Sequence, residues 1–319
     1  MKAWRAQRGI ALLTAIILVA IATIVAVSVA WQSALHARRA IAVYTIAQSF
    51  AYAQGAEAMA AAALRQNRQD NPHIVAPGQG WAMPNGPLEV DAGAVLEASL
   101  EDQAGKFNLN SLVMQPNPGG PLVANPAAIK QFEALLQMLQ IDVKYVARVV
   151  DWIDTDSEPN SLGGAEDSYY LAQDPPYRTL NMTLTSSSEL LAMGMDRASY
   201  DKLKNLVTAL PPDTKVNLCT APGEVLDALA GGTISFSIDA KGLAAKRAQF
   251  NCFPDVPTFM TTVNPSLKQA LQSQVDTTSS YFRLRTWITI GTTRFTLYSL
   301  LYQDQGGQIR SILRTFGTE

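Results

Sequence analysis

Residues 10–31 read IALLTAIILVAIATIVAVSVAW and contain no charged side chain. An α-helix of this length, rising ~1.5 Å per residue, extends ~33 Å, which is enough to cross the hydrocarbon core of a bilayer. Three cations, Lys2, Arg5 and Arg8, precede this run, and Arg38 and Arg39 follow it. The excess on the N-terminal side favours a cytoplasmic N-terminus. The sequence therefore predicts a single-pass protein of the inner membrane whose remaining chain lies in the periplasm.

The junction before the apolar run differs from that of an ordinary secretory signal, whose cleavage site follows the apolar region. Here the small residue Gly9 directly precedes Ile10, so a cut between them removes residues 1–9 and keeps the membrane helix. The order Arg8-Gly9 followed by IALLT resembles the site at which prepilin peptidase processes type IV pilin-like proteins. We therefore expect a leader of residues 1–9 and a mature chain that begins at an N-methylated Ile10. An uncleaved signal anchor is the alternative.

Composition narrows the possible functions. The 319-residue chain has a formal net charge of −2, which argues against a nucleic-acid binder that neutralises phosphates. Of its two histidines, His36 follows the membrane run and His73 lies in a Pro- and Gly-rich link. Neither is placed for catalysis. No nucleophile-elbow, phosphate-loop or dinucleotide motif is present, and we expect no enzymatic activity. In the periplasm Cys219 and Cys252 are expected to form a disulfide, with two buried free thiols as the alternative.

Hydrophobic periodicity divides the rest of the chain into helical and strand-like stretches. Residues 10–68 lack proline and read as one long helix whose second half is amphipathic. Residues 88–112 and 281–316 alternate apolar and polar side chains, and the second stretch predicts a three-stranded antiparallel meander. Residues 125–210 carry helical patterns instead. A further helix is expected soon after residue 216, with Thr220 as its N-cap.

These patterns predict an α+β fold. A long N-terminal helix covers residues 10–70, of which 10–31 cross the membrane. A domain with an antiparallel β-sheet is expected in two parts, residues 71–112 and 215–319. A large inserted α-helical domain, residues 113–214, separates the two parts.

One segment concentrates negative charge. No lysine or arginine lies between Arg148 and Arg178, and six carboxylates fall within residues 151–167: Asp151, Asp154, Asp156, Glu158, Glu166 and Asp167. Held in one compact loop, they repel one another unless they are solvated, protonated or bridged by a cation. Several hard oxygen ligands in a loop that contains glycine suit Ca²⁺ better than Mg²⁺, which dehydrates reluctantly. These six residues predict a calcium site; an exposed acidic loop without a metal is the alternative.

Several motifs together resemble the K-class minor pseudopilins of type II secretion systems. They are the junction at residues 8–14, GKFNLN at 105–110, DWID at 151–154, GAEDSYY at 164–170, DPPYR at 174–178 and NLCTAPGEVL at 217–226. The resemblance implies a pilin-like fold with an inserted α-domain, and a calcium site on the acidic loop. It also implies assembly with I- and J-class minor pseudopilins at the tip of a periplasmic filament. Prepilin peptidase and the inner membrane are further partners that it implies, and nucleic acid is not among them.

Position 14 departs from the pattern of most pilin-like proteins, which carry a glutamate at the fifth mature position. That carboxylate neutralises the N-terminus of a neighbouring subunit inside the bilayer. Here the residue is Thr14, whose hydroxyl can form a hydrogen bond but cannot cancel a buried ammonium charge. A subunit without the carboxylate is poorly suited to a repeating shaft and is tolerable at its end. K-class proteins share this substitution, so the resemblance implies a subunit that initiates or caps the filament for protein export across the outer membrane.

Two other functions share part of this evidence. A minor pilin of a type IV pilus or uptake machine has the same N-terminal pattern, although Thr14 and the large acidic insert argue against it. A signal-anchored periplasmic metal-dependent hydrolase would require a catalytic set of histidines or carboxylates that the sequence does not present.

Overall fold

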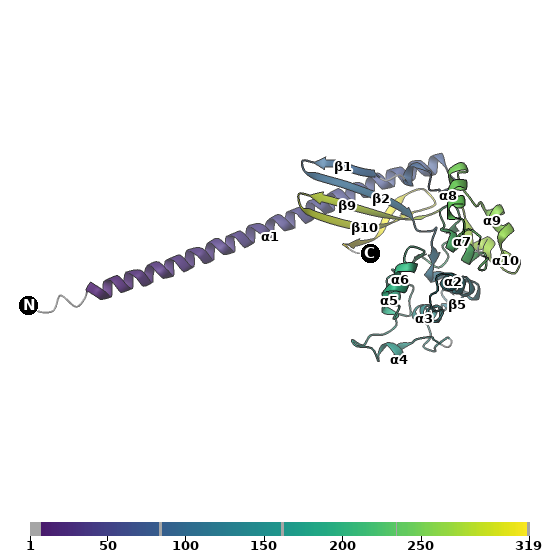
Figure 1. The fold of residues 1–319 in the computed structure, drawn as a ribbon, viewed down its shortest axis with the longest axis horizontal. Coiled ribbons are helices and arrows are strands. Elements are labelled where there is room, and N and C mark those ends of the chain that lie inside the picture. The colour runs from purple at the N-terminus through teal and green to yellow at the C-terminus, as the bar shows by residue number, and fades with distance from the viewer. Residues whose placement is uncertain (1–7, 83–84, 161–162, 234, 318–319) are drawn as a thin grey trace, which may run out of the picture.

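The computed structural model describes residues 8–82, 85–160, 163–233 and 235–317. Its longest element is α1 (Arg8–Asp70), a 63-residue helix that projects from a folded head as a rod ~95 Å long (Figure 1). Every side chain over residues 10–44 is exposed. Among the described helices, α1 alone is long and apolar enough to cross a membrane, which fits a single-pass anchor.

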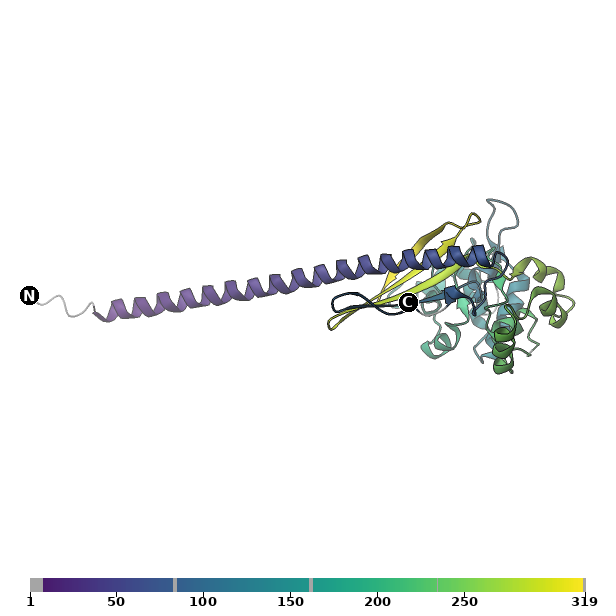
Figure 2. The ribbon, with the colours of Figure 1, turned by 90° about the horizontal axis from the view of Figure 1, so that it is seen from above.

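A five-stranded antiparallel sheet lies against the second half of α1 (Figures 1 and 2). Its strands, in spatial order, are β1 (Asn85–Asp91), β2 (Ala94–Asp102), β9 (Tyr281–Ile290), β10 (Thr293–Gln303) and β11 (Ile309–Phe316). The last three are the meander expected from the alternation of residues 281–316. β2 pairs with β9 although most of the head lies between them in the sequence. The expected α+β fold is confirmed.

The alternation in β9 determines which side chains face α1. Phe282, Leu284 and Ile288 are buried in a cluster with the helix, whereas Arg283 and Arg285 project from the opposite face. The helix contributes alanines and a leucine at helical spacing: Ala53, Ala56, Ala60 and Leu64. Because alanine side chains are small, the helix axis can approach the sheet closely.

Polar contacts of Glu57 and Arg68 help to hold α1 on the sheet. Glu57 accepts hydrogen bonds from Nε of Arg314 at 2.8 Å and from Nη2 at 2.7 Å, and a third from the Ser299 hydroxyl at 2.6 Å. Near the end of the helix, Arg68 donates to the carbonyls of Asp304 and Gln305 at 2.9 and 2.6 Å. Each contact joins α1 to strands β10 and β11 or to the turn between them.

The chain between β2 and β9 forms a mostly helical part at the end of the head that lies away from the free end of α1 (Figure 1). Its helices are α2 (Pro126–Met138), α3 (Lys144–Ile153), α4 (Asp167–Tyr170), α5 (Glu189–Ala192), α6 (Arg197–Leu203), α7 (Gly223–Leu229), α8 (Ala240–Gln249), α9 (Val256–Thr262) and α10 (Lys268–Gln274). Short strands pair as β3 (Phe107–Asn108) with β6 (Val207–Thr208), β4 (Val113–Met114) with β5 (Val123–Ala124), and β7 (Val216–Asn217) with β8 (Val275–Asp276). Short 3₁₀ helices form at Gly80–Ala82 and Leu109–Leu112.

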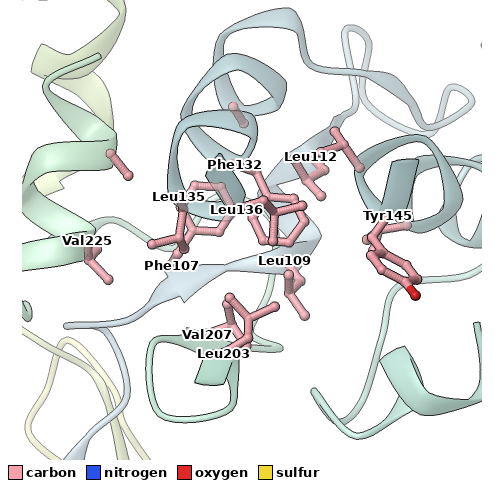
Figure 3. Close-up of a cluster of buried hydrophobic side chains, with 14 of the residues drawn as sticks. Phe107, Leu109, Leu112, Phe132, Leu135, Leu136, Tyr145, Leu203, Val207 and Val225 are labelled. Atoms are coloured by element: carbon pink, nitrogen blue, oxygen red, sulfur yellow. The ribbon is translucent and has the colours of Figure 1, made fainter. Parts of the chain in front are cut away.

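The helical part has its own hydrophobic core, separate from the cluster under α1 (Figure 3). Phe107 and Phe132 stack at its centre with ring centroids 5.3 Å apart. Leu135 and Leu136 of α2, together with Val225 of α7, surround this pair. The sheet and the helical part of the head therefore each have a hydrophobic core of their own.

One boundary differs from the expectation for residues 215–319. Helices α7–α10 occupy residues 223–274, and Leu226, Phe259 and Leu271 pack into the core of the helical part. The sheet resumes only at β9. Of these helices, α7 is the one expected soon after residue 216. α8–α10 have seven to ten residues each, too short for a clear 3.6-residue period to stand out in the sequence.

A buried carboxylate links the two parts of the head. Asp102, at the end of β2, accepts hydrogen bonds from Ser279 at 2.5 Å, Thr220 at 2.6 Å and Asn217 at 2.8 Å. Burial raises the pKa of Asp102 despite these donors. Thr220 is therefore not the N-cap that the sequence indicated. Its hydroxyl is used in this long-range contact, and α7 begins later, after Pro222.

A disulfide joins Cys219, just before α7, to Cys252, just after α8, with the two Cα atoms 4.7 Å apart. Arg247 of α8 connects the same two segments through hydrogen bonds. It donates to the Phe253 carbonyl at 2.8 Å and to the carbonyls of Leu218 and Ala221 at 2.9 and 2.7 Å. Burial lowers the pKa of Arg247 to about 10, so the side chain is still charged at neutral pH.

Candidate metal centre

The acidic segment lies between the C-terminal end of α3 and the N-terminal end of α4. α3 is amphipathic and buries Val146, Val149, Val150 and Ile153 in the core of the helical part, which fixes the position of its last turn. Asp154 is the C-cap of α3, and Glu166 is the N-cap of α4. Two carboxylates that are twelve positions apart in the sequence therefore lie at adjacent helix ends.

Asp151 organises the loop between these helices. Its side chain is fully buried, and one carboxylate oxygen accepts hydrogen bonds from both the backbone and the side-chain nitrogen of Asn160, each at 3.0 Å. The other oxygen accepts from the backbone nitrogen of Ala165 at 2.7 Å. Asp151 thus ties the middle and the end of the loop to α3, and its hydrogen-bonding capacity is taken up by the protein.

Three of the six predicted carboxylates meet. One oxygen from each of Asp154, Asp156 and Glu166 lies within 4.8 Å of the others. Asp154 and Glu166 are buried, and Asp156 is exposed, so the cluster opens to solvent on one side. Within the described residues, Oδ1 of Asp154 and both carboxylate oxygens of Glu166 are buried without a hydrogen-bond partner. Buried polar atoms without a partner are unfavourable, so these oxygens require a proton, water or a cation.

The electrostatics of the cluster agree with this geometry. Burial, followed by repulsion from Asp151 and Asp154, raises the pKa of Glu166 to about 7. Burial, and repulsion from Asp156 and Asp151, raise the pKa of Asp154 to about 6 despite a hydrogen bond from Asn160. At neutral pH the ionised forms of these two carboxyl groups are destabilised by burial and by mutual repulsion. A bound cation would offset this repulsion.

The donor set fits a hard divalent cation. Carboxylate oxygens with spare lone pairs, in a loop that also offers backbone carbonyls, are the ligands that Ca²⁺ takes in proteins. Asn181 adds a further oxygen next to the cluster: its amide nitrogen donates to the Asp156 carbonyl at 3.1 Å, and its Oδ1 is buried without a hydrogen-bond partner among the described residues. No spacing signal in the sequence links Asn181 to the acidic loop.

The structure places the other predicted ligands differently. Asp167 forms an ion pair with Arg178 at 3.2 Å and accepts hydrogen bonds from the backbone and hydroxyl of Thr179 at 3.1 and 3.0 Å. Glu158 is exposed, and its backbone nitrogen donates to Asp156 at 2.9 Å. Asp151 holds the loop through its hydrogen bonds with Asn160 and Ala165. These three carboxylates lie outside the group that converges.

Aromatic side chains from the motifs support the site. The Trp152 and Tyr170 rings meet edge to face, with centroids 5.0 Å apart, and Tyr177 lies 5.3 Å from Tyr170. Trp152 also donates its indole N–H to Glu189 at 3.2 Å. The DWID, GAEDSYY and DPPYR segments are therefore parts of one structure, in which the aromatic residues pack and the acidic residues converge.

The other predicted functional positions lie far away, in α1. Residues 1–7 of the predicted leader are outside the described residues, and Gly9 and Ile10 lie in the first turn of the helix. The Thr14 hydroxyl donates to the Ala11 carbonyl at 3.0 Å, within the same helix. Thr14 therefore presents no group to a neighbour that could replace a carboxylate.

Comparisons with known proteins agree with one another. A family model described as type II secretion system (T2SS), protein K, matches residues 105–212, which include the candidate metal centre. The type II secretion system protein K of Pseudomonas aeruginosa is 33% identical over 98% of this chain and 94% of its own length. The protein K of Aeromonas hydrophila is 31% identical over 99% of both chains.

A solved structure is also similar. A chain in the crystal structure of the GspK–GspI–GspJ complex from the type 2 secretion system of enterotoxigenic Escherichia coli matches with a TM-score of 0.75. The match has 27% identity and covers 88% of this chain and 100% of that chain. Sequence similarity across nearly the whole length and a shared fold lead to one conclusion: the chain belongs to the type II secretion system protein K family, the K-class minor pseudopilins.

Proposed function

We propose that this protein occupies the tip of the secretion pseudopilus, where it initiates or caps the filament for protein export across the outer membrane. The observation that carries the proposal is Thr14, whose hydroxyl bonds within its own helix and which brings no negative charge to a neighbouring N-terminus. In a shaft, each subunit needs a partner for a buried ammonium group, since desolvating it alone costs several kcal/mol. At the end of the filament one neighbour is absent and the requirement is relaxed.

The shape of the head supports the same position. The helical part lies beyond the sheet, at the end of the head away from the membrane helix (Figure 1). A subunit added at that end would meet this bulk and would lack a surface like the one that α1 and the sheet provide. The protein is proposed to be structural, with no enzymatic reaction assigned to it.

The proposed partners are I- and J-class minor pseudopilins. The similar solved chain lies in a complex named GspK–GspI–GspJ. In this chain, Ile41, Val43, Tyr44 and Ile46 of α1 are more than half exposed although they lie beyond the membrane-length segment. Packing these side chains against partner helices would bury apolar surface that neither lipid nor the chain's own head covers. The head is proposed to lie in the periplasm.

Calcium is proposed to bind at Asp154, Asp156 and Glu166, with the loop held by Asp151. Bound there, the ion would neutralise carboxylates that otherwise repel one another, and it would fix the loop between α3 and α4. The buried oxygens of Asp154 and Glu166 that lack partners support this assignment. The role is structural: the ion would stabilise the helical part.

Immunogold labelling of isolated pseudopili tests the tip position. An epitope inserted at Pro118, in the exposed loop between β4 and β5, should place gold at one end of each filament, because this loop is outside the core. The same epitope on the shaft-forming subunit serves as the control and should label the whole length. Label from this protein along the filament body would contradict the proposal.

A further inference from the structure

Two adjacent arginines follow the membrane-length segment of α1. Between Arg8 and Glu57 the sequence contains no other lysine, arginine, aspartate or glutamate than Arg38 and Arg39. Both side chains are exposed, and among the described residues neither has an ion pair or a hydrogen bond. They form a small, isolated site of positive charge on an otherwise uncharged stretch of the helix.

The length of the apolar run determines the depth of these arginines in a bilayer. Residues 10–30 of a helix extend ~30 Å, which is the thickness of the hydrocarbon core. Trp31 follows at the end of that core, and tryptophan is enriched at this boundary. Arg38 lies ~10 Å beyond Trp31 along the helix, and the headgroup layer is ~5–8 Å thick. The two arginines therefore lie at the outer limit of the lipid headgroups.

The side chains can reach the phosphate groups from this position. Arg38 is seven residues after Trp31 and so lies on the same side of the helix, with Arg39 turned ~100° away from it. Long arginine side chains can lie back along an apolar helix surface while the charged group stays in water or among headgroups. A guanidinium donates two parallel hydrogen bonds to phosphate oxygens. Because the two arginines point in different directions, each can bind a separate phosphate.

The position of this charge is not explained by membrane topology or by α1 itself. Lysine and arginine normally accumulate on the cytoplasmic side of a membrane helix, so two arginines at the opposite end act against the expected orientation. The first carboxylate further along α1, that of Glu57, is ~27 Å from Arg39 along the axis, several times the Debye length of ~8 Å. The anionic groups at the same depth as the arginines are lipid phosphates.

We propose that Arg38 and Arg39 bind the phosphate groups of anionic phospholipids in the leaflet that faces the head. Basic residues next to a membrane helix are attracted to anionic lipids in this way. The contacts would fix the depth of α1 in the bilayer, and they would have to be released when the subunit leaves the bilayer for a filament. The proposal requires that residues 10–31 span the membrane. It depends neither on the metal centre nor on the position of the protein in the filament.

Energy transfer in lipid vesicles tests the proposal with the full chain. A donor dye is attached at Ser33→Cys, since the two native cysteines are bonded to each other. The acceptor dye is carried on an acyl chain of phosphatidylglycerol or of phosphatidylcholine, in vesicles that contain both lipids. The anionic probe should be enriched around the helix by up to about fivefold per arginine at about 50 mM salt, and clearly less at about 500 mM. Arg38→Gln with Arg39→Gln should abolish the preference, whereas Arg38→Lys with Arg39→Lys should keep most of it.

Arg65→Gln with Lys241→Gln is the matched control, because it removes the same charge from exposed positions in the head. It should change the preference by less than about twofold. An equal loss in this control would reduce the effect to net charge and overturn the site.

Three further results would overturn the proposed ligand. The first is equal transfer to both probes in the wild-type protein, which would leave the arginines to solvent or to a partner helix. The second is loss of the preference in inorganic phosphate but not in chloride of the same ionic strength, which would assign the arginines to small anions. The third is a preference seen only in a chain that ends at Gly317, which would assign them to the C-terminus of the chain itself.

Discussion

Two buried carboxylates, Asp154 and Glu166, make the stability of the candidate metal centre depend on pH. Their folded pKa values, about 6 and about 7, lie above the ordinary values of 3.8 and 4.5. Between about pH 4 and pH 7 the metal-free native state therefore binds more protons than the unfolded state, and its stability falls as the pH rises. Calcium bound as proposed would require the ionised forms, so its contribution would grow over the same range.

Calcium is thus expected to raise the melting temperature of the full chain at pH 8 and to have little effect at pH 5. At a free concentration of a hundred times Kd, the gain is about 2.7 kcal/mol, and a chelator should abolish it. Scanning calorimetry with calcium or chelator measures the difference. The pair Asp154→Asn and Glu166→Gln should remove the calcium response, because it removes the buried ligands.

Glu158→Gln is the informative control for this experiment. Glu158 is exposed and lies outside the three converging carboxylates, so its substitution should leave the calcium response intact. A wild-type melting curve that is the same with calcium and with chelator at pH 8 would contradict the assignment.

The candidate metal centre could be predicted from the sequence only in part. The absence of lysine and arginine between Arg148 and Arg178 identifies the acidic loop from the sequence alone. Which carboxylates converge depends on contacts over longer distances: Asp151 is satisfied by Asn160 and Ala165, and Asp167 by Arg178 and Thr179. Spacing along the chain cannot separate a ligand from a supporting residue, because the hydrogen-bond partners that occupy Asp151 and Asp167 are known only from the fold.

Helices α7 and α8 are joined twice, once by the disulfide and once by Arg247. The arginine binds carbonyls that flank Cys219 and the carbonyl that follows Cys252. We expect either connection alone to keep the two segments together. Losing both should therefore cost more than the sum of the separate losses, which is the signature of coupled groups.

The expected values follow from the chemistry of each connection. Replacing both cysteines with alanine should lower the free energy of unfolding by ~3 kcal/mol, and Arg247→Gln by ~1–3 kcal/mol, since it leaves carbonyls without their charged donor. Urea titration of the four variants gives the interaction energy directly. Lys241→Gln, an exposed change on α8, is the control and should be close to neutral. Strictly additive losses would show that the two connections act on separate regions.

Elements with a strong hydrophobic periodicity could be predicted from the sequence, whereas the short helices α8–α10 could not. The alternation from Tyr281 to Phe316 gave the order and pairing of β9, β10 and β11 because one face of the sheet is buried against α1. Helices α8–α10 were missed, since their seven to ten residues give few buried positions each. Their helical state depends on packing in the core of the helical part, which is a tertiary effect.

The exposed apolar half of α1 makes the whole molecule dependent on its surroundings. The side chains of residues 10–44 are all exposed to the surroundings of the chain, so we expect lipid or partner helices to cover them. The mature chain purified from a cell that contains prepilin peptidase should begin at Ile10 and carry an N-methyl group. Intact-mass spectrometry measures this. Gly9→Val should block the cut, because a branched side chain replaces the small residue at the junction, while Ala11→Val changes the same region and should leave processing intact. Recovery of wild-type protein that still begins at Met1 would contradict the predicted cleavage before Ile10.

The division of the head into two cores was only partly accessible from the sequence. The expected insert ends at residue 214, whereas Leu226, Phe259 and Leu271 extend the helical core well beyond that point. The link between the cores depends on Asp102 and its donors Asn217, Thr220 and Ser279, which are far apart in the sequence. A buried aspartate at a strand end has no periodic signature, so its role is visible only in three dimensions.

The contacts of Glu57 and Arg68 with the sheet have a mechanical consequence. Glu57 and Arg68 are ~16 Å apart along the helix axis, and each is fastened to β10, β11 or their turn. A helix that is held at two separated points resists rotation about its own axis relative to the sheet. We therefore expect a rotation or displacement of the membrane-spanning end of α1 to be transmitted to the head, so that both ends move together.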